Sequence, residues 1–254
     1  TVTNNLRGTT GNDTITGTNA NDYISGLDGD DTINAGTGAD LIVGGAGIDT
    51  IHGDADDDVI AGGTGNDVLY GDAGSDILRG DVGDDTLDGG IGADRLEGGA
   101  GTDTLTGGDG TDTLSGGAGN DTLTGGLLSD TFEWTLGDVG ARGTPAVDTI
   151  TDFNPASQAS GGDVLDLRDL LSGENHTVGT GNLANFLHFE QVGADAKVHI
   201  SSTGAFGGGF TTGAEDQTIV LTGVNVYTDL GLSVNATDQQ VIQDLLTKGK
   251  LIVD

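Results

Sequence analysis

Apolar and acidic residues recur at fixed places in a nine-residue period that runs from residue 8 to residue 133. The sixth residue of the phrase is aspartate in all fourteen copies: Asp13, Asp22, Asp31, Asp40, Asp49, Asp58, Asp67, Asp76, Asp85, Asp94, Asp103, Asp112, Asp121 and Asp130. The eighth residue is large and apolar in every copy, beginning with Ile15 and ending with Phe132. A fixed period repeated without insertion is the sequence signature of a solenoid, whose repeats stack on their neighbours.

The other positions of the phrase predict a tight turn followed by a short strand. Glycine holds the first position in every copy except Ala35, and the fourth position in all but Ala20, Asp56 and Leu128. Without a Cβ atom, glycine turns tightly and adopts positive φ angles. The last three positions are predicted to form a strand whose middle side chain points inward, because side chains alternate along a strand. If two phrases form one coil of eighteen residues, each aspartate stacks on the aspartate two phrases later.

The aspartates indicate what holds these turns together. One inward aliphatic side chain per phrase is too thin a core to order a chain in which 49 of 254 residues are glycine. A carboxylate beside a turn of exposed carbonyl groups is a hard, all-oxygen site, which suits Ca²⁺ better than zinc or copper. We therefore predict Ca²⁺ between stacked loops, bound by the fourteen sixth-position aspartates. A disordered acidic tract would have no reason to keep an apolar residue at every eighth position.

The phrase at residues 98–106, Gly-Gly-Ala-Gly-Thr-Asp-Thr-Leu-Thr, resembles the repeats-in-toxin (RTX) nonapeptide, a Ca²⁺-binding parallel β-helix repeat. The resemblance implies that backbone carbonyls of the loop join the aspartates as ligands, at Gly62, Gly63, Gly65, Gly89, Gly90, Gly92, Gly98, Gly99, Gly101, Gly107, Gly108, Gly110, Gly116, Gly117 and Gly119. Copies one to three carry Thr9, Thr18 and Leu27 at the second position, and the copies at 53–58 and 125–130 also depart from the pattern. Weaker or altered calcium sites are expected there.

Residues 134–254 have a different character. Five segments with alternating polar and apolar residues predict strands at 148–153, 163–167, 186–190, 197–201 and 218–221. One helix follows, with a capping box of Thr237 and Gln240, an apolar face that includes Val241 and Leu245, and a stop at Gly249. We predict an all-β fold: a polar lead-in at 1–7, a calcium-bound parallel β-roll at 8–133, and a β-rich C-terminal domain with one helix at 134–254.

Several segments of residues 134–254 also resemble those of a known family. D-T-I-T-D-F, G-D-V-L-D-L-x-D-L-L and D-Q-T-I-V-L-T-G-V, followed by a helix and an apolar-acidic tail, are similar to the C-terminal target domain of type I secreted proteins, particularly giant bacterial adhesins. The resemblance implies an uncleaved signal at the C-terminus that the type I secretion apparatus reads. It also implies upstream adhesin domains and a secreted, extracellular or cell-surface location. Asp148, Asp152, Asp163 and Asp166 are either further calcium ligands or solvated turn residues.

The charge and composition of the chain restrict the kinds of binding partner that it can have. The formal net charge is −33 with only 8 Lys and Arg residues, which excludes a nucleic-acid-binding surface. Two rows of seven loops leave room for about twelve divalent ions, whose charge of about +24 would bring −33 to about −9. We find no apolar run of membrane-spanning length and no N-terminal signal peptide. We expect a monomer without a transmembrane segment.

No recognisable catalytic motif occurs in the sequence. There is no H-E-x-x-H, no G-x-S-x-G and no cysteine, and His52, His176, His188 and His199 are not spaced as zinc ligands on one helix. We therefore predict a non-catalytic module for calcium-dependent folding and type I secretion. Two alternatives remain. The chain could be the C-terminal part of a secreted protease or lipase, or it could be an ice- or ligand-binding solenoid that uses an outward threonine file (Thr14, Thr32, Thr50) or apolar file (Tyr23, Leu41, Val59, Ile77).

Overall fold

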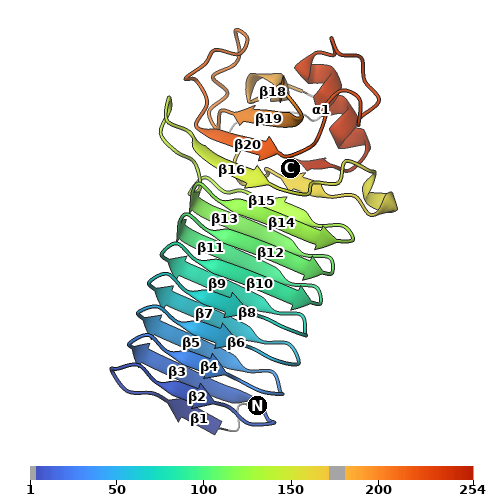
Figure 1. Ribbon diagram of the computed structural model, residues 1–254. Helices are drawn as coiled ribbons and strands as arrows, with labels where there is room; N and C mark the ends of the chain where they lie inside the picture. The colour runs from blue at the N-terminus through green and yellow to red at the C-terminus, as the bar shows by residue number, and fades with distance from the viewer. Residues whose placement is uncertain (1–3, 172–180, 254) are drawn as a thin grey trace.

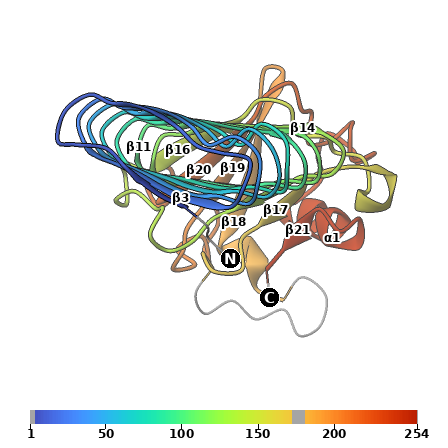
Figure 2. The ribbon, with the colours of Figure 1, turned by 90° about the horizontal axis from the view of Figure 1, so that it is seen from below.

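The computed structural model describes residues 4–171 and 181–253 and has the shape of an elongated β-solenoid covered at one end by a β-rich unit (Figure 1). Two parallel sheets form the walls of the solenoid, and its coils lie over one another when viewed from the N-terminal end (Figure 2). Tyr23 pairs with Leu41 and Thr86 with Thr104, so the register shift between neighbouring strands is eighteen residues. The predicted coil of two phrases is confirmed, and the fourteen phrases form about seven turns.

The strands alternate between the two sheets along the chain. Within the described residues, the first sheet has ten strands, in the order β1 (Asn4–Arg7), β3 (Asp22–Asp28), β5 (Leu41–Ala46), β7 (Val59–Thr64), β9 (Ile77–Val82), β11 (Arg95–Gly101), β13 (Thr113–Gly119), β15 (Thr131–Glu133), β17 (Val164–Asp166) and β21 (Leu251–Ile252). The described part of the second sheet has eleven, in the order β18 (Leu187–Val192), β19 (Asp195–Ile200), β20 (Gln217–Leu221), β16 (Ala146–Ile150), β14 (Thr122–Leu127), β12 (Thr104–Asp109), β10 (Thr86–Ile91), β8 (Val68–Tyr70), β6 (Thr50–His52), β4 (Thr32–Asn34) and β2 (Thr14–Thr16).

Both sheets continue past the last nonapeptide phrase. The strands β16 and β17 pair in parallel with β14 and β15, and β20 and β21 extend the two sheets by one further strand each. The hairpin of β18 and β19 then adds to β20 with antiparallel pairing. At the other end, β1 lies in register with β3, so residues 4–7 form a strand of the first sheet. The division at residues 8, 133 and 134 stays a prediction, because the sheets are continuous across it.

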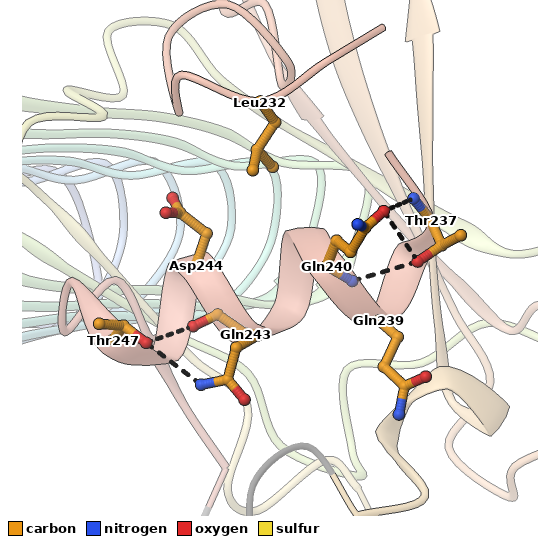
Figure 3. A pocket seen from close by; sticks show the side chains of 7 residues that line it. All are labelled: Leu232, Thr237, Gln239, Gln240, Gln243, Asp244 and Thr247. Carbon is orange, nitrogen blue, oxygen red and sulfur yellow. Dashed lines mark hydrogen bonds between the residues drawn. The ribbon is translucent and has the colours of Figure 1, made fainter. Parts of the chain in front are cut away.

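The one α-helix of the described residues, α1 (Asp238–Thr247), lies where the sequence predicts it (Figure 3). The Thr237 side chain accepts a hydrogen bond from the Gln240 backbone, and the Gln240 side chain accepts one from the Thr237 backbone, so the predicted capping box is present. The apolar face of the helix packs inward through Val241, Ile242 and Leu245. After the helix, Gly249 adopts a φ of 68°, which ends the helix as expected. Within the described residues, no helix is long and apolar enough to cross a membrane.

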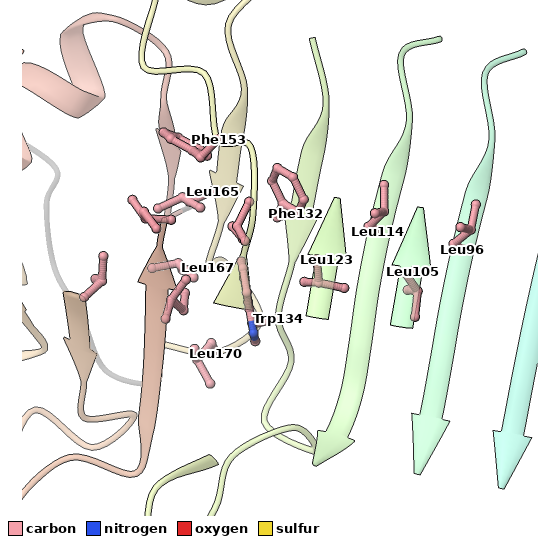
Figure 4. Packing of buried hydrophobic residues seen from close by; sticks show 14 of the residues in the cluster. Leu96, Leu105, Leu114, Leu123, Phe132, Trp134, Phe153, Leu165, Leu167 and Leu170 are labelled. Atoms are coloured by element: carbon pink, nitrogen blue, oxygen red, sulfur yellow. The ribbon is translucent and has the colours of Figure 1, made fainter. Parts of the chain in front are cut away.

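The apolar core is a single-file ladder between the sheets. The eighth-position side chains are at most 1% exposed from Ile24 to Phe132, whereas Ile15 in the first copy is only partly buried. Figure 4 shows how the ladder of Leu96, Leu105, Leu114 and Leu123 is followed by aromatic side chains at the C-terminal end. First-position glycines such as Gly44 are also buried, so the strands present two inward positions per phrase rather than the predicted one.

The N-terminal coils should be the least stable part of the solenoid. Thr9, Thr18 and Leu27 replace loop glycines there, and the partly buried Ile15 belongs to an end coil with one stacked neighbour. In saturating Ca²⁺ we expect faster amide hydrogen exchange in residues 8–34 than in residues 89–124. Equal protection of the two segments, measured by mass spectrometry, would mean that neither the glycine replacements nor the end position weakens these coils.

Candidate metal-binding site

The sixth-position aspartates form two columns, one along each edge of the solenoid. In each column, one carboxylate oxygen accepts a hydrogen bond from the backbone N–H of the aspartate one coil earlier. The Asp85 N–H donates to Asp103 Oδ1 at 2.8 Å, and the Asp103 N–H donates to Asp121 Oδ1 at 2.9 Å. We call Asp13, Asp31, Asp49, Asp67, Asp85, Asp103 and Asp121 the first aspartate column. Asp22, Asp40, Asp58, Asp76, Asp94, Asp112 and Asp130 form the second aspartate column.

The second carboxylate oxygen is buried without a partner in the interior of both columns. Among the fourteen column aspartates, Oδ2 has no hydrogen-bond partner in twelve: Asp31, Asp40, Asp49, Asp58, Asp67, Asp76, Asp85, Asp94, Asp103, Asp112, Asp121 and Asp130. These side chains are at most 3% exposed. An ionised oxygen that is buried without a partner is costly, and native structures rarely keep such groups unsatisfied. A regular series of twelve points to a cationic ligand.

The pKa values of these carboxylates also indicate that a cation binds beside them. Burial raises the pKa of Asp58 to about 8 and the pKa values of Asp76 and Asp103 to about 7, and neighbouring carboxylates of the columns raise them further. A bound divalent cation would offset both causes, because it replaces the lost hydration and neutralises the stacked charges.

First-position glycines lie beside the unpartnered oxygens of both columns, except at Asp40, whose phrase begins with Ala35. A Cβ atom placed on Gly71 would lie 2.6 Å from Asp76 Oδ2 and 2.6 Å from the carbonyl oxygen of Gly89 in the next coil. A Cβ atom on Gly89 would meet Asp94 Oδ2 and the Gly107 carbonyl oxygen at the same two distances. Carboxylate and carbonyl oxygens therefore converge on one space between stacked coils. Such oxygens are the ligands of Ca²⁺, so the residues present fit this ion.

The predicted loop glycines divide into two groups. First-position carbonyls, including those of Gly62, Gly98 and Gly116, converge with a column aspartate of the previous coil. Second- and fourth-position carbonyls, such as those of Gly90 and Gly92, point at the glycine one coil later, which leaves no room for a side chain there. Within the described residues no three His, Cys, Asp or Glu side chains gather as a metal cluster; the oxygens that face aspartates such as Asp76 and Asp94 are backbone carbonyls. The ligand roles of the aspartates and glycines stay predictions.

The first copies differ from the interior, as their loop sequences suggest. Asp13 Oδ2 accepts a hydrogen bond from the Thr9 N–H at 2.6 Å, and Asp22 Oδ2 accepts one from the Thr18 N–H at 2.7 Å. These two oxygens are therefore satisfied by the chain. The last copy departs most in sequence, yet Asp130 keeps the unpartnered oxygen of the interior aspartates.

In the part of the chain that the structure describes, the remaining predicted groups form no second cluster of metal-binding side chains, although the rings of His188 and His199 stack with centroids 5.8 Å apart. His52 stacks on Tyr70 with ring centroids 4.4 Å apart on the outside of the second sheet, and its Nδ1 lies 2.9 Å from Asp72 Oδ2. His188 and His199 lie on the paired strands β18 and β19, while His176 lies outside the described residues. The apolar file is half-exposed at Leu41, Val59 and Ile77, with exposed fractions of 37–40%.

Two further aspartates extend the columns beyond the repeats. Asp148 Oδ1 accepts a hydrogen bond from the Asp121 N–H at 3.0 Å, and Asp163 Oδ1 accepts one from the Asp130 N–H at 3.1 Å. The sequence contains the signal for both, since Asp148-Thr149-Ile150 and Asp163-Val164-Leu165 repeat the aspartate-x-apolar part of the phrase. Their longer loops interrupt the nine-residue period, so the period alone does not reveal them.

The coil geometry, the two aspartate columns and the oxygen-lined spaces define a calcium-binding parallel β-solenoid. A model of the RTX calcium-binding nonapeptide repeat family matches residues 7–42, 34–69, 62–96, 70–105 and 97–132. The chain is an RTX calcium-binding nonapeptide-repeat protein. RTX repeats bind Ca²⁺ as a structural ion, and RTX modules are typical of type I secreted, extracellular bacterial proteins.

Among the solved structures, this chain is similar to two subunits of one enzyme and to a lipase. The AlgE6R3 subunit of the Azotobacter vinelandii mannuronan C5-epimerase is 27% identical over 60% of this chain and 76% of that chain, with a TM-score of 0.41. The AlgE6R2 subunit is 24% identical over 65% and 83%, with a TM-score of 0.37. The extracellular lipase LipA from Serratia marcescens is 19% identical over 100% of this chain and 40% of that chain, with a TM-score of 0.33. The search of curated proteins found no match.

Proposed function

We propose that this chain is a non-catalytic module that folds on binding extracellular Ca²⁺ and directs the type I secretion of a bacterial protein, most consistent with a cell-surface adhesin. The observation that carries the folding part is the series of twelve buried, unpartnered carboxylate oxygens. Without cations, the stacked carboxylates repel one another, so the coils cannot close. With Ca²⁺ between them, the same carboxylates hold neighbouring coils together.

The concentration of calcium then decides where the chain folds. Extracellular Ca²⁺ modules bind with a Kd of about 10⁻⁴ to 10⁻³ M, which is far above the free calcium concentration of a cytosol. Ligands that bind only the folded state stabilise it by mass action, and many sites acting together make the transition steep. The solenoid would therefore remain unfolded inside the cell, as passage through a secretion channel requires, and would fold outside.

The non-catalytic role is supported by the residues that the solenoid exposes. The sequence contains none of the common hydrolase motifs, and within the described residues the outer faces of the sheets carry mixed threonine, charged and apolar side chains such as Thr104, Arg95 and Ile77. Any chemistry of the parent protein would then belong to other domains. The adhesin assignment rests on the resemblance of residues 148–254 to the target domains of giant adhesins. A protease or lipase parent would instead have a catalytic domain upstream of this module.

The exposed face of α1 is the candidate for recognition by the secretion apparatus. Gln239, Gln243 and Thr247 are exposed on this face, which borders a surface hollow beside Leu232 (Figure 3). The opposite face is buried, and the residues after the helix form β21 in the first sheet. Deleting residues 238–254 would therefore remove a strand of the fold along with any signal. Substitutions on the exposed face separate the two roles.

We expect the double variant Gln239→Lys/Gln243→Lys to be exported severalfold less by a type I apparatus, because it changes the exposed face without touching the buried one. Its gain of β structure on adding Ca²⁺ should equal that of the wild type in circular dichroism. Thr86→Lys/Thr104→Lys, which adds the same charge to the exposed outer face of β10 and β12, is the matched control. Normal export of the helix variant would place the signal elsewhere and remove the basis for assigning it to α1.

A further inference from the structure

At the C-terminal ends of the two aspartate columns, the carboxylates have hydrogen-bond partners that the interior aspartates lack. In the interior, Oδ2 of each column aspartate lacks a partner. At the C-terminal end of the second column, Asp163 Oδ2 instead accepts a hydrogen bond from the Asn154 N–H at 2.6 Å. At the same end of the first column, Asp148 Oδ2 accepts hydrogen bonds from Trp134 Nε1 at 2.6 Å and from Gln217 Nε2 at 2.7 Å. The carboxylates of Asp148 and Asp163 are therefore fully satisfied by the chain.

A buried ammonium group lies at the end of the second column. Lys250 is 0% exposed, and its Nζ donates hydrogen bonds to the carbonyl oxygens of Asp163 at 2.7 Å and Asn154 at 3.1 Å. The Phe153 ring lies 5.9 Å from Nζ, which adds a favourable cation–π contact. Buried lysine is rare unless its charge is compensated. Carbonyl oxygens next to a carboxylate are the kind of ligand set that the interior spaces offer to a metal ion.

The position of Lys250 links three distant parts of the chain. It directly precedes β21, which pairs with β17, and the Leu165 N–H donates to the Lys250 carbonyl oxygen at 2.8 Å. The segment around this lysine also contacts the last nonapeptide loop: the N–H groups of Gly125 and Gly126 donate to Asp152, and the Ser129 hydroxyl donates to the Gly162 carbonyl oxygen. Burial lowers the pKa of Lys250 to about 8, so at neutral pH the side chain is mostly charged and neutralises the end of the second column without any dissolved ion.

We propose that the chain closes both aspartate columns at their C-terminal ends with its own donors in place of Ca²⁺, and that the Lys250 ammonium is the built-in cation of the second column. The proposal rests on the calcium-dependent folding described above, and it states where along the columns calcium binding stops. The calcium ladder stops at Asp121 and Asp130, and Asp148 and Asp163 bind no metal. The last coil thus offers the adjacent calcium-bound coil a surface that is already neutralised.

The number of bound calcium ions tests whether calcium binding stops before Asp148 and Asp163. In equilibrium dialysis of the full chain at saturating Ca²⁺, Asp163→Asn should bind as many ions as the wild type, because its carboxylate is not a ligand. The interior variant Asp103→Asn should bind at least one ion fewer, while it keeps the hydrogen bond from the Asp85 N–H. Loss of an ion in Asp163→Asn would overturn the proposal. A wild-type chain that binds no calcium would instead defeat the proposed function.

The role of the ammonium is tested by removing its charge at nearly constant length. Lys250→Met should raise the Ca²⁺ concentration for half-maximal gain of β structure severalfold, with an unchanged number of ions in the folded protein. Lys197→Met removes the same charge from β19, outside both columns, and should match the wild type. A wild-type midpoint for Lys250→Met would overturn the role of Lys250. If Lys250→Met does not fold at any Ca²⁺ concentration, the ion count of Asp163→Asn decides.

Discussion

Removal of calcium should convert residues 8–133 from β-solenoid to coil, with loss of most of the β signal in far-ultraviolet circular dichroism. A site occupied at 10 to 100 times its Kd stabilises the folded state by about 1.4 to 2.7 kcal/mol. Twelve such sites contribute on the order of 20 kcal/mol, whereas domains are stable by only about 5 to 15 kcal/mol in total. Loss of the ions therefore reverses the sign of the folding free energy. The net charge of −33, no longer offset, adds repulsion to this loss.

Two controls distinguish specific binding from the screening of charge. Sodium chloride at 1 M shortens the Debye length to about 3 Å and weakens repulsion between exposed carboxylates, but it supplies no ligand for buried oxygens. Magnesium demands near-ideal octahedral geometry and gives up its water reluctantly. We expect a cooperative return of β structure at millimolar Ca²⁺, and little return with sodium chloride or Mg²⁺ alone. A chain with equal β content in chelator and in calcium would contradict calcium-dependent folding.

The solenoid is predictable from the sequence because its determinants are local and periodic. Aspartate and apolar positions recur every nine residues, and the alternation of side chains along a strand places the apolar ones inside. The stacking of phrases two apart then follows, and with it the two columns. What the period does not reveal is the inward placement of the first-position glycines. These residues are buried whether the strand continues past them, as at Gly44 in β5, or ends just before them, as at Gly53 after β6.

The closure of the columns depends on contacts that sequence spacing cannot supply. Lys250 and Asp163 are 87 residues apart, and Gln217 and Asp148 are 69 residues apart. In the sequence, Lys250 is one lysine beside a glycine at the end of a helix, and nothing local distinguishes it from Lys248. The structure buries one of them fully, because β21 joins the first sheet immediately after it. The short aspartate-x-apolar motifs at Asp148 and Asp163 are visible only when the loop length is allowed to vary.

Substitution of a single loop glycine inside the solenoid should destabilise it more than loss of one carboxylate charge. Gly92 occupies the fourth position of its phrase with a φ of 151°, and a Cβ atom there would overlap the carbonyl oxygen of Gly74 one coil earlier. The Gly92 N–H also donates to the Asp109 carbonyl oxygen at 3.0 Å, so the loop is held between two neighbours. The backbone can neither rotate to a favourable φ nor move away without breaking this stacking.

We therefore expect Gly92→Ala to lower the free energy of unfolding in saturating Ca²⁺ by about 3 kcal/mol or more, from the positive φ and the overlap together. Gly11→Ala is the matched control, because Gly11 holds the same position of the phrase and a Cβ atom on it would meet nothing within 4 Å. Urea unfolding monitored by circular dichroism measures both variants, and Gly11→Ala should stay within a few tenths of a kcal/mol of the wild type. Equal stability of the two variants would mean that neighbouring coils can separate locally, and that the glycines are required for calcium ligation rather than for the close stacking of the coils.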